Sequence, residues 1–158
     1  MVKNGGVNIH YWEKRMANKI PENLAKILKE IGETPQTSLW DCHGTWVINH
    51  KSLEKIAVRF GIKFDDPVII ESDQKNKCVV LTVRGRRNII SENGKMGEVT
   101  EWSFGEASPY NNKNGYPYAM AEKRAKDRVI LKLIGMHGDT YSEDEADDFK
   151  NSKPRGVR

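Results

Sequence analysis

The sequence has few cysteines and no long apolar run, and both absences limit what it can be. Its 158 residues include only two cysteines, Cys42 and Cys78. Two are too few for a disulfide framework and these are not spaced as metal ligands, so we expect reduced thiols. No apolar run reaches the roughly 20 residues that a membrane helix needs, and residues 1–12 lack the apolar core of a signal peptide. We therefore expect a cytoplasmic protein with no membrane partner.

Motifs of several enzyme classes are absent as well. There is no GxxxxGK[ST] phosphate loop, so ATP-driven chemistry is not expected, and there is no CxxC or HExxH pattern. The only cluster resembling a metal site is the segment 41–43 (DCH) together with His50. Hydrogen-bonded or surface histidines explain the same residues, whereas a metal-dependent nuclease would need His43, His50 and nearby acids to converge. We expect no catalytic residue, no metal and no cofactor.

Charge is strongly segregated along the chain. The net charge is +4, yet residues 139–149 (DTYSEDEADDF) hold six acids and no Lys or Arg. The rest of the chain therefore has 26 basic residues against 16 acidic ones. A basic body attracts polyanions by releasing their counterions, and nucleic-acid backbones are the commonest cellular polyanion. The alternative is a basic charge that only confers solubility.

Apolar residues at helical spacing predict four helices. We expect one over residues 9–20, a second that begins at Pro21 and ends at Gly32, a third over residues 53–60 with Gly61 after its end, and a fourth over residues 118–135. Residues 1–8 are expected to be flexible.

Strand patterns occupy the middle of the chain. Residues 39–48 predict a short strand or hairpin, and a three-stranded antiparallel meander is expected over the ranges 68–71, 78–84 and 98–104. The second strand either ends at Arg84 or continues through residues 88–90, in which case Gly85 marks a bulge or bend. We interpret Trp102 and Phe104 as core residues. The predicted class is α+β: a meander of three to four strands packed on a long basic helix, with a helical N-terminus.

Two basic segments are candidates for binding an anion. The fourth predicted helix carries Arg124, Arg128 and Lys132 at i, i+4 and i+8, which places them on one stripe. A solvated cationic face is the alternative. The second segment is residues 84–87 (RGRR), whose guanidinium groups could fork onto phosphates or could form an exposed hairpin tip. The candidate binding residues are Arg84, Arg86, Arg87, Lys113, Lys123, Arg124, Lys126, Arg128 and Lys132.

The segment 105–117 is a long polar loop that leads into the basic helix, and loops of this length usually have a function. Tyr110, Tyr116 and Tyr118 flank it and are candidates for stacking on bases. Beyond residue 138 we expect a tail over residues 139–158, acidic then basic and partly disordered, with a short helix from Ser142. This tail could shield the basic surface, recruit a basic partner or simply be disordered.

The order of these elements resembles the single-strand annealing protein superfamily, the Rad-fifty-two-like group that includes many phage recombinases. Three stretches carry the resemblance: residues 44–61 as a short strand and first core helix, 78–105 as the meander, and 121–135 as the long basic helix. The resemblance implies a domain over residues 9–138 that holds ssDNA by its backbone in the groove of an oligomeric ring. Residues 33–39 (ETPQTSL) lack the basic contact that this family has in its first strand region.

In that family the groove-lining positions correspond to Arg128 and Lys132, with Arg124 and Lys126 one turn earlier. The sequence thus predicts a non-enzymatic, ATP-independent protein that binds and anneals single-stranded DNA in phage or plasmid recombination. The implied setting is the cytoplasm of a bacterial host, with homo-oligomers and an SSB or exonuclease as possible partners. The alternatives are a nucleic-acid-binding module that does not anneal, such as a regulator or RNA binder, and the metal-dependent nuclease.

Overall fold

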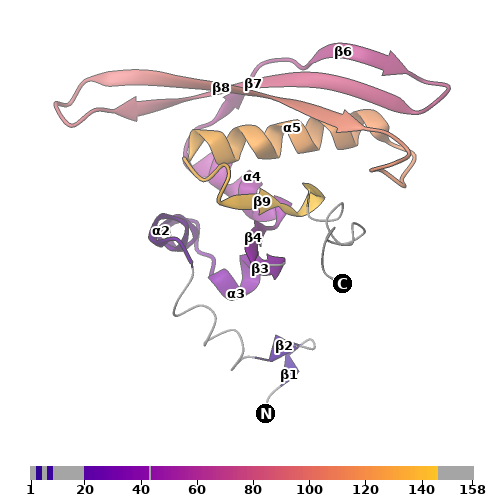
Figure 1. Cartoon of the computed structure of the whole chain (residues 1–158). Coiled ribbons are helices and arrows are strands. Elements are labelled where there is room, and N and C mark those ends of the chain that lie inside the picture. The colour runs from indigo at the N-terminus through magenta and orange to yellow at the C-terminus, as the bar shows by residue number, and fades with distance from the viewer. Residues whose placement is uncertain (1–2, 5–6, 9–19, 43, 146–158) are drawn as a thin grey trace.

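The computed structural model describes residues 3–4, 7–8, 20–42 and 44–145 (Figure 1). The helix expected over residues 9–20 lies, except for Ile20, outside the described residues, and so does the tail beyond residue 145. Near the N-terminus, β1 (Lys3–Asn4) and β2 (Val7–Asn8) form a small antiparallel pair. The rest combines helices with mainly antiparallel strands, which confirms the predicted α+β class.

The larger sheet is built around one long hairpin. Its strands are β5 (Lys63–Phe64), β6 (Val68–Asp73), β7 (Cys78–Ile90) and β8 (Met96–Ala107). β7 is central, because it pairs with β8 on one side and with β5 and β6 on the other. The predicted meander is therefore confirmed, with β5 as an added fourth strand, and β7 does continue to Ile90.

The prediction of a β-bulge at Gly85 is wrong. The register of β7 with β8 is unbroken from Val79 opposite Ala107 to Ile90 opposite Met96, and the irregularity lies in β6 between Ile69 and Glu71. Gly85 is needed for another reason. A Cβ at this position would lie 2.7 Å from Cγ1 of Val129, on the helix that packs against the sheet.

A smaller sheet forms the other end of the domain. β3 (Leu39–Cys42) and β4 (Thr45–Ile48) make the antiparallel hairpin that the sequence suggested, with Gly44 at φ +89° in the turn. β9 (Thr140–Ser142) adds to β4 in parallel. Residues 140–142 therefore belong to the folded domain rather than to a tail, and their two outer members, Thr140 and Ser142, are completely buried.

Four helices lie wholly within the described residues: α2 (Glu22–Glu30), α3 (Pro35–Ser38), α4 (His50–Arg59) and α5 (Pro117–Leu133). α2, α4 and α5 confirm the predicted helices. Asn49 caps α4 by accepting a hydrogen bond from the backbone N–H of Ser52 at 2.8 Å. The glycines expected to end α2 and α4, Gly32 and Gly61, both have positive φ, as a helix C-terminus favours. None of these helices is long and apolar enough to cross a membrane.

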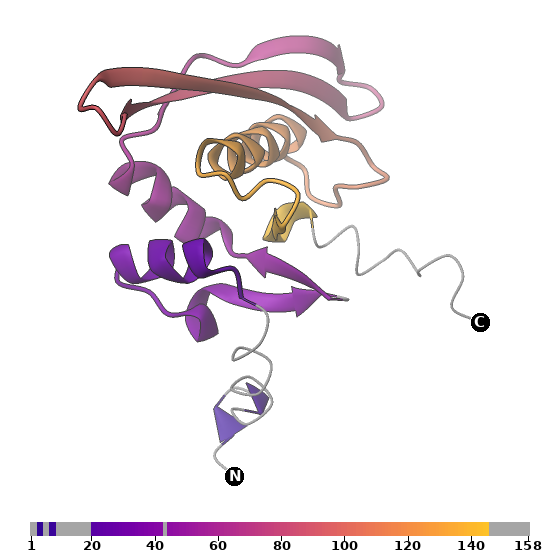
Figure 2. The same ribbon diagram turned by 60° about the vertical axis from the view of Figure 1, so that its left-hand side comes forward.

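α5 is the central helix of the domain. It lies along one face of the larger sheet, with α4 on its far side (Figure 1, Figure 2). Ala121 and Ala125 pack with Val79, Leu81 and Val83 of the sheet. Further along the helix, Ile130 and Leu131 join a second cluster made with α2, α4 and the smaller sheet, which includes Leu24, Leu28, Ile48, Leu53 and Ile56. One helix thus supplies side chains to both cores.

The interpretation of Trp102 and Phe104 as core residues is wrong. They are 45% and 43% exposed and lie on the face of the sheet that points away from α5. The side chains that face α5 from β8 are Ser103, Gly105 and Ala107. Small residues are required there because α5 approaches the strand closely, so the alternation of a strand sends the large aromatic residues outward.

The short helix expected to begin with Ser142 as its cap is confirmed where the structure describes it. Ser142 ends β9, and the helical backbone begins at Glu143 and runs through the described residues to Glu145. Ser142 therefore has the extended backbone and the position of an N-cap residue, but its Oγ is buried without a hydrogen-bond partner among the described residues, so the expected side-chain cap is not formed.

We predict that Gly105→Ala strongly destabilises the fold. The added Cβ would lie 1.9 Å from the backbone oxygen of Ala121 and 2.8 Å from Cβ of Ala125, so α5 would have to move away from β8. We expect the free energy of unfolding to fall by about 3 kcal/mol or more. Gly97→Ala is the matched control on the same strand, because its Cβ would meet nothing closer than 3.8 Å. Urea denaturation measures both, and equal losses would contradict this account of the packing.

Candidate nucleic-acid interface

The exposed face of the larger sheet brings arginine and aromatic side chains together. Val79, Leu81 and Val83 of β7 are buried against α5, so the alternate residues Arg84 and Arg86 lie on the opposite face. On β8 the same alternation places Trp102 and Phe104 there. No described element covers this face (Figure 1, Figure 2). We call these four side chains the outer-face patch.

Cross-strand pairing fixes the geometry of the outer-face patch. Arg84 is directly opposite Trp102, and Thr82 is opposite Phe104. The two aromatic rings meet edge to face, with centroids 5.2 Å apart and planes at 79°. Nζ of Lys132 lies 5.8 Å from the centroid of the Trp102 ring. The patch therefore offers two exposed ring systems, with Arg84 opposite Trp102 on the neighbouring strand and the ammonium group of Lys132 near the Trp102 ring.

The arginines of the RGRR segment do not share one role. Arg84 is exposed and has no ion-pair partner among the residues the structure describes. Arg86 forms an ion pair with Asp65, and both side chains remain partly exposed. Arg87 is on the face toward the helices, where its guanidinium carbon lies 4.9 Å from the centroid of the Phe60 ring. Arg84 and Arg86 can therefore meet a ligand on the outer face, and Arg87 cannot.

The basic stripe of α5 is mostly engaged with the edge of β8. Arg124 donates to the carbonyl of Glu106 at 2.8 Å, Arg128 to that of Phe104 at 2.8 Å, and Lys132 to that of Trp102 at 2.7 Å. The i, i+4, i+8 spacing of the helix thus matches alternate carbonyls of the strand. In the described chain, β8 pairs with β7 alone, so its other edge has no strand beside it. We call these three contacts the edge ladder.

The three side chains of the edge ladder differ in how deeply they are buried and in how many other partners they have. Arg124 is only 4% exposed and also donates to the backbone carbonyl and side-chain oxygen of Asn111, so it is a structural residue that holds the 105–117 loop. Arg128 also forms an ion pair with Glu145. Lys132 is bound at the edge beside Trp102. Only Arg128 and Lys132 of this stripe remain near a solvent-accessible surface.

The remaining candidate residues are dispersed. Lys123 pairs with Asp144 at 3.3 Å, and Lys126 pairs with Glu122 and lies over the Phe64 ring. Lys113 is exposed in the loop. All three tyrosines proposed for stacking are exposed. Tyr118 is the least exposed of them, and its hydroxyl is hydrogen-bonded to Ser72. The structure does not gather these residues into the outer-face patch.

Sequence reasoning missed Trp102 and Phe104 as surface residues, although a signal was present. In the segment 102–107 (WSFGEA) large and small side chains alternate. If the small ones pack on a helix, the large ones must face solvent. The apolar character of the aromatics suggested a core, but the close approach of α5 leaves no room for them on its side.

The histidine cluster considered from sequence has a different composition in the structure. His43 is outside the described residues. His50 does converge with acids. Its Nε2 is 3.0 Å from Oε1 of Glu54, one turn later on α4, and its Nδ1 is 2.7 Å from Oδ1 of Asp127, which is remote in sequence. Asp144 completes a group whose ligand-type atoms all lie within 4.8 Å of one another.

Comparison with protein-family models and with curated proteins gives no match to this chain. The interface is therefore defined by the geometry alone. That geometry is an uncovered sheet face with paired arginine and aromatic side chains, beside an edge lined by cations.

We predict that Arg124→Met destabilises the fold although methionine fills a similar volume. The change would leave the backbone carbonyls of Glu106 and Asn111 without their side-chain donor in a buried site. We expect a loss of about 2 kcal/mol or more in the free energy of unfolding. Arg84→Met, the same change at an exposed position, should alter it by no more than about 0.5 kcal/mol. If chemical denaturation found Arg124→Met as stable as the wild type, Arg124 would not be structural.

Proposed function

We propose that this protein binds single-stranded DNA across the outer-face patch and promotes the annealing of complementary strands without ATP. The observation that carries the proposal is the pairing of Arg84 with Trp102 on an uncovered sheet face, beside Phe104. Bases of any sequence can stack on exposed aromatic rings, and guanidinium groups can bind the neighbouring phosphates. The resemblance to single-strand annealing proteins supports DNA pairing as the purpose of this binding.

The chemistry required is electrostatic rather than catalytic. Cations at Arg84, Arg86 and Lys132 offset the repulsion between two phosphate backbones and release counterions. Base pairing between the strands supplies the specificity, so the protein need not read sequence. An open face, unlike a deep channel, leaves the bases of the bound strand accessible to a complementary strand.

The size of the outer-face patch implies that several copies act together. The four residue steps along the strand from Thr82 to Arg86 span about 13 Å, which is about four stacked nucleotides at their spacing in duplex DNA. A single copy would therefore hold only a short stretch, and Glu98 and Glu106 bound the patch on the same face of β8. We accordingly propose a homo-oligomer that aligns patches from neighbouring copies. An SSB or an exonuclease remains a proposed partner from the resemblance.

An apolar edge strand supports self-association. β6 pairs only with β7 among the described strands, and its residues Val68, Ile69 and Ile70 are more than half exposed. An uncovered edge of this kind is a template for pairing with another chain. Ile90 and Met96, at the end of the β7–β8 hairpin, are also exposed and could extend the contact.

We predict that the protein accelerates the pairing of complementary oligonucleotides in buffer that contains EDTA and no ATP. Fluorescence measures the rate of pairing. Trp102→Ala should weaken single-strand binding by about 1–3 kcal/mol if one base stacks on the ring. Arg84→Ala should lower the slope of log K against log salt by about 0.7 if it contacts one phosphate. Both variants should anneal more slowly, because both contacts hold the strand on the open face.

Arg59→Ala is the matched control for charge, because Arg59 is exposed on α4, on the other side of α5 from the patch. The affinity of the Arg59→Ala variant for single-stranded DNA, and the slope of log K against log salt, should equal those of the wild type. No acceleration over protein-free pairing would refute the annealing activity. Tighter binding to duplex or to one sequence would indicate a regulator, tighter binding to RNA an RNA-binding module, and cleavage on adding Mg²⁺ a nuclease.

We predict that Ile70→Lys reduces self-association measured by light scattering after gel filtration. A charge on the exposed edge strand should oppose pairing of β6 with another copy. Val58→Lys is the control, because Val58 is also an exposed apolar residue but lies on α4. A monomeric wild type, or an equal loss of mass in both variants, would argue against β6 as the contact.

A further inference from the structure

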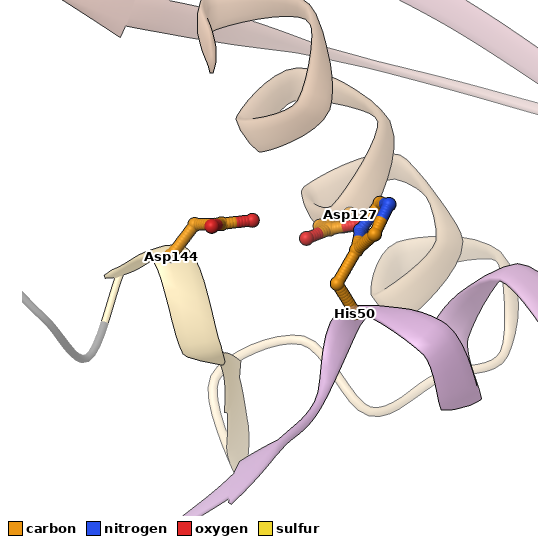
Figure 3. Close-up of side chains that lie close together, drawn as sticks. All are labelled: His50, Asp127 and Asp144. Carbon is orange, nitrogen blue, oxygen red and sulfur yellow. The ribbon is translucent and has the colours of Figure 1, made fainter. Parts of the chain in front are cut away.

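Figure 3 shows the His50 cluster, made of His50, Asp127 and Asp144, none of which belongs to the outer-face patch. Each residue comes from a different segment: His50 begins α4, Asp127 lies in the middle of α5, and Asp144 follows β9. One possible ligand atom of each falls within 4.8 Å of the other two. The fold therefore brings an imidazole and two carboxylates together from positions up to 94 residues apart.

The two carboxylates are buried and incompletely paired. Asp127 is fully buried and Asp144 is 6% exposed. In each of them Oδ2 is buried without a hydrogen-bond partner among the described residues. Figure 3 shows the carboxyl groups facing each other across a short gap. Two buried anions in this arrangement repel each other unless a positive charge is placed between them.

The groups around the cluster supply only part of that charge. His50 shares a hydrogen bond with Oδ1 of Asp127 at 2.7 Å and another with exposed Glu54. Nζ of Lys123 is 3.3 Å from Oδ1 of Asp144. Burial raises the pKa of Asp127 to about 7, His50 lowers it, and the neighbouring Asp144 raises it. The pKa of His50 is raised, chiefly by its hydrogen bond to Asp127. The two Oδ2 atoms still have no cationic partner described.

We propose that His50, Asp127 and Asp144 bind a divalent transition-metal ion of the Zn²⁺ or Mn²⁺ kind. One imidazole nitrogen and two carboxylate oxygens form a mixed ligand set that suits these ions. Ligand atoms sit about 2.1 Å from such an ion, so the group has to contract modestly from its 4.8 Å spread. The Oδ2 atoms without hydrogen-bond partners provide the free lone pairs.

The burial of the ligands indicates a structural ion rather than a catalytic one. A catalytic metal keeps a position open for water or substrate, whereas here two of the three ligands are almost completely buried. The ion would connect α4, α5 and the segment after β9. Polar contacts already join them: the His50 N–H to Glu143, the His50–Asp127 hydrogen bond, and the Lys123–Asp144 and Arg128–Glu145 pairs. The inference does not depend on DNA binding.

The test uses the full chain, stripped with EDTA and then dialysed, and titrated with Mn²⁺ alone at pH 7.5. We expect calorimetry to show that one equivalent of Mn²⁺ binds per chain with micromolar affinity. Electron spin echo of the bound Mn²⁺ should show coupling to a ¹⁴N nucleus from His50. Saturation at 100 times Kd should raise Tm by about 5–10 °C. No binding below about 1 mM, or no nitrogen coupling, would overturn the proposal.

Four variants separate a built site from general attraction to acids. Asp144→Asn and His50→Gln should each weaken Mn²⁺ binding by about tenfold or more. Glu145→Gln removes the same charge as Asp144→Asn from the adjacent position, and should leave the affinity unchanged. Lys123→Met removes the competing cation beside Asp144, so it should strengthen binding, on the order of tenfold. Equal affinities in all four variants would mean non-specific binding and would also refute the site. If Asp144→Asn does not fold, the Mn²⁺ affinity of His50→Gln and the ¹⁴N coupling in the wild type test the proposal.

Discussion

The edge ladder is the interaction on which the rest of this domain depends. An edge strand carries carbonyl groups that need partners, and α5 provides three of them from residues spaced one turn apart. These bonds hold the helix close against β8, so the strand can present only small side chains to it. The large residues Trp102 and Phe104 are then forced onto the open face. A packing requirement on one side of the strand thus exposes, on the other side, the aromatic residues of the patch that we propose binds DNA.

This coupling explains both the success and the failure of the sequence reasoning. Periodicity and turn residues predicted α2, α4, α5, the β3–β4 hairpin and the β6–β8 meander, because each is encoded locally. The i, i+4, i+8 stripe of α5 was recognised, but its interpretation needed information that is not local. Whether Arg124 meets a phosphate or a carbonyl depends on how close β8 lies, and a single sequence does not specify that distance.

The same limit applies to contacts between distant segments. Nothing near Thr140 in the sequence indicates that it pairs with β4, since a parallel strand of three residues has no turn signal of its own. His50 could be noted as a candidate ligand, yet no sequence pattern joins it to the distant segments that contain its neighbours Asp127 and Asp144. The sequence therefore indicates which residues have the chemistry to bind a ligand, but it does not indicate which of them lie together in one site.

The division of the core between two clusters has a consequence for how the chain folds during synthesis. Ala121 and Ala125 complete the core under the sheet, and Ile130 and Leu131 complete the one beneath α4. All four belong to α5, which leaves the ribosome after α2, α3 and α4 and after every described strand except β9. Neither core can close until that helix has emerged. The long hairpin must wait with its apolar face exposed, so the chain depends on prompt arrival of α5 to avoid aggregation.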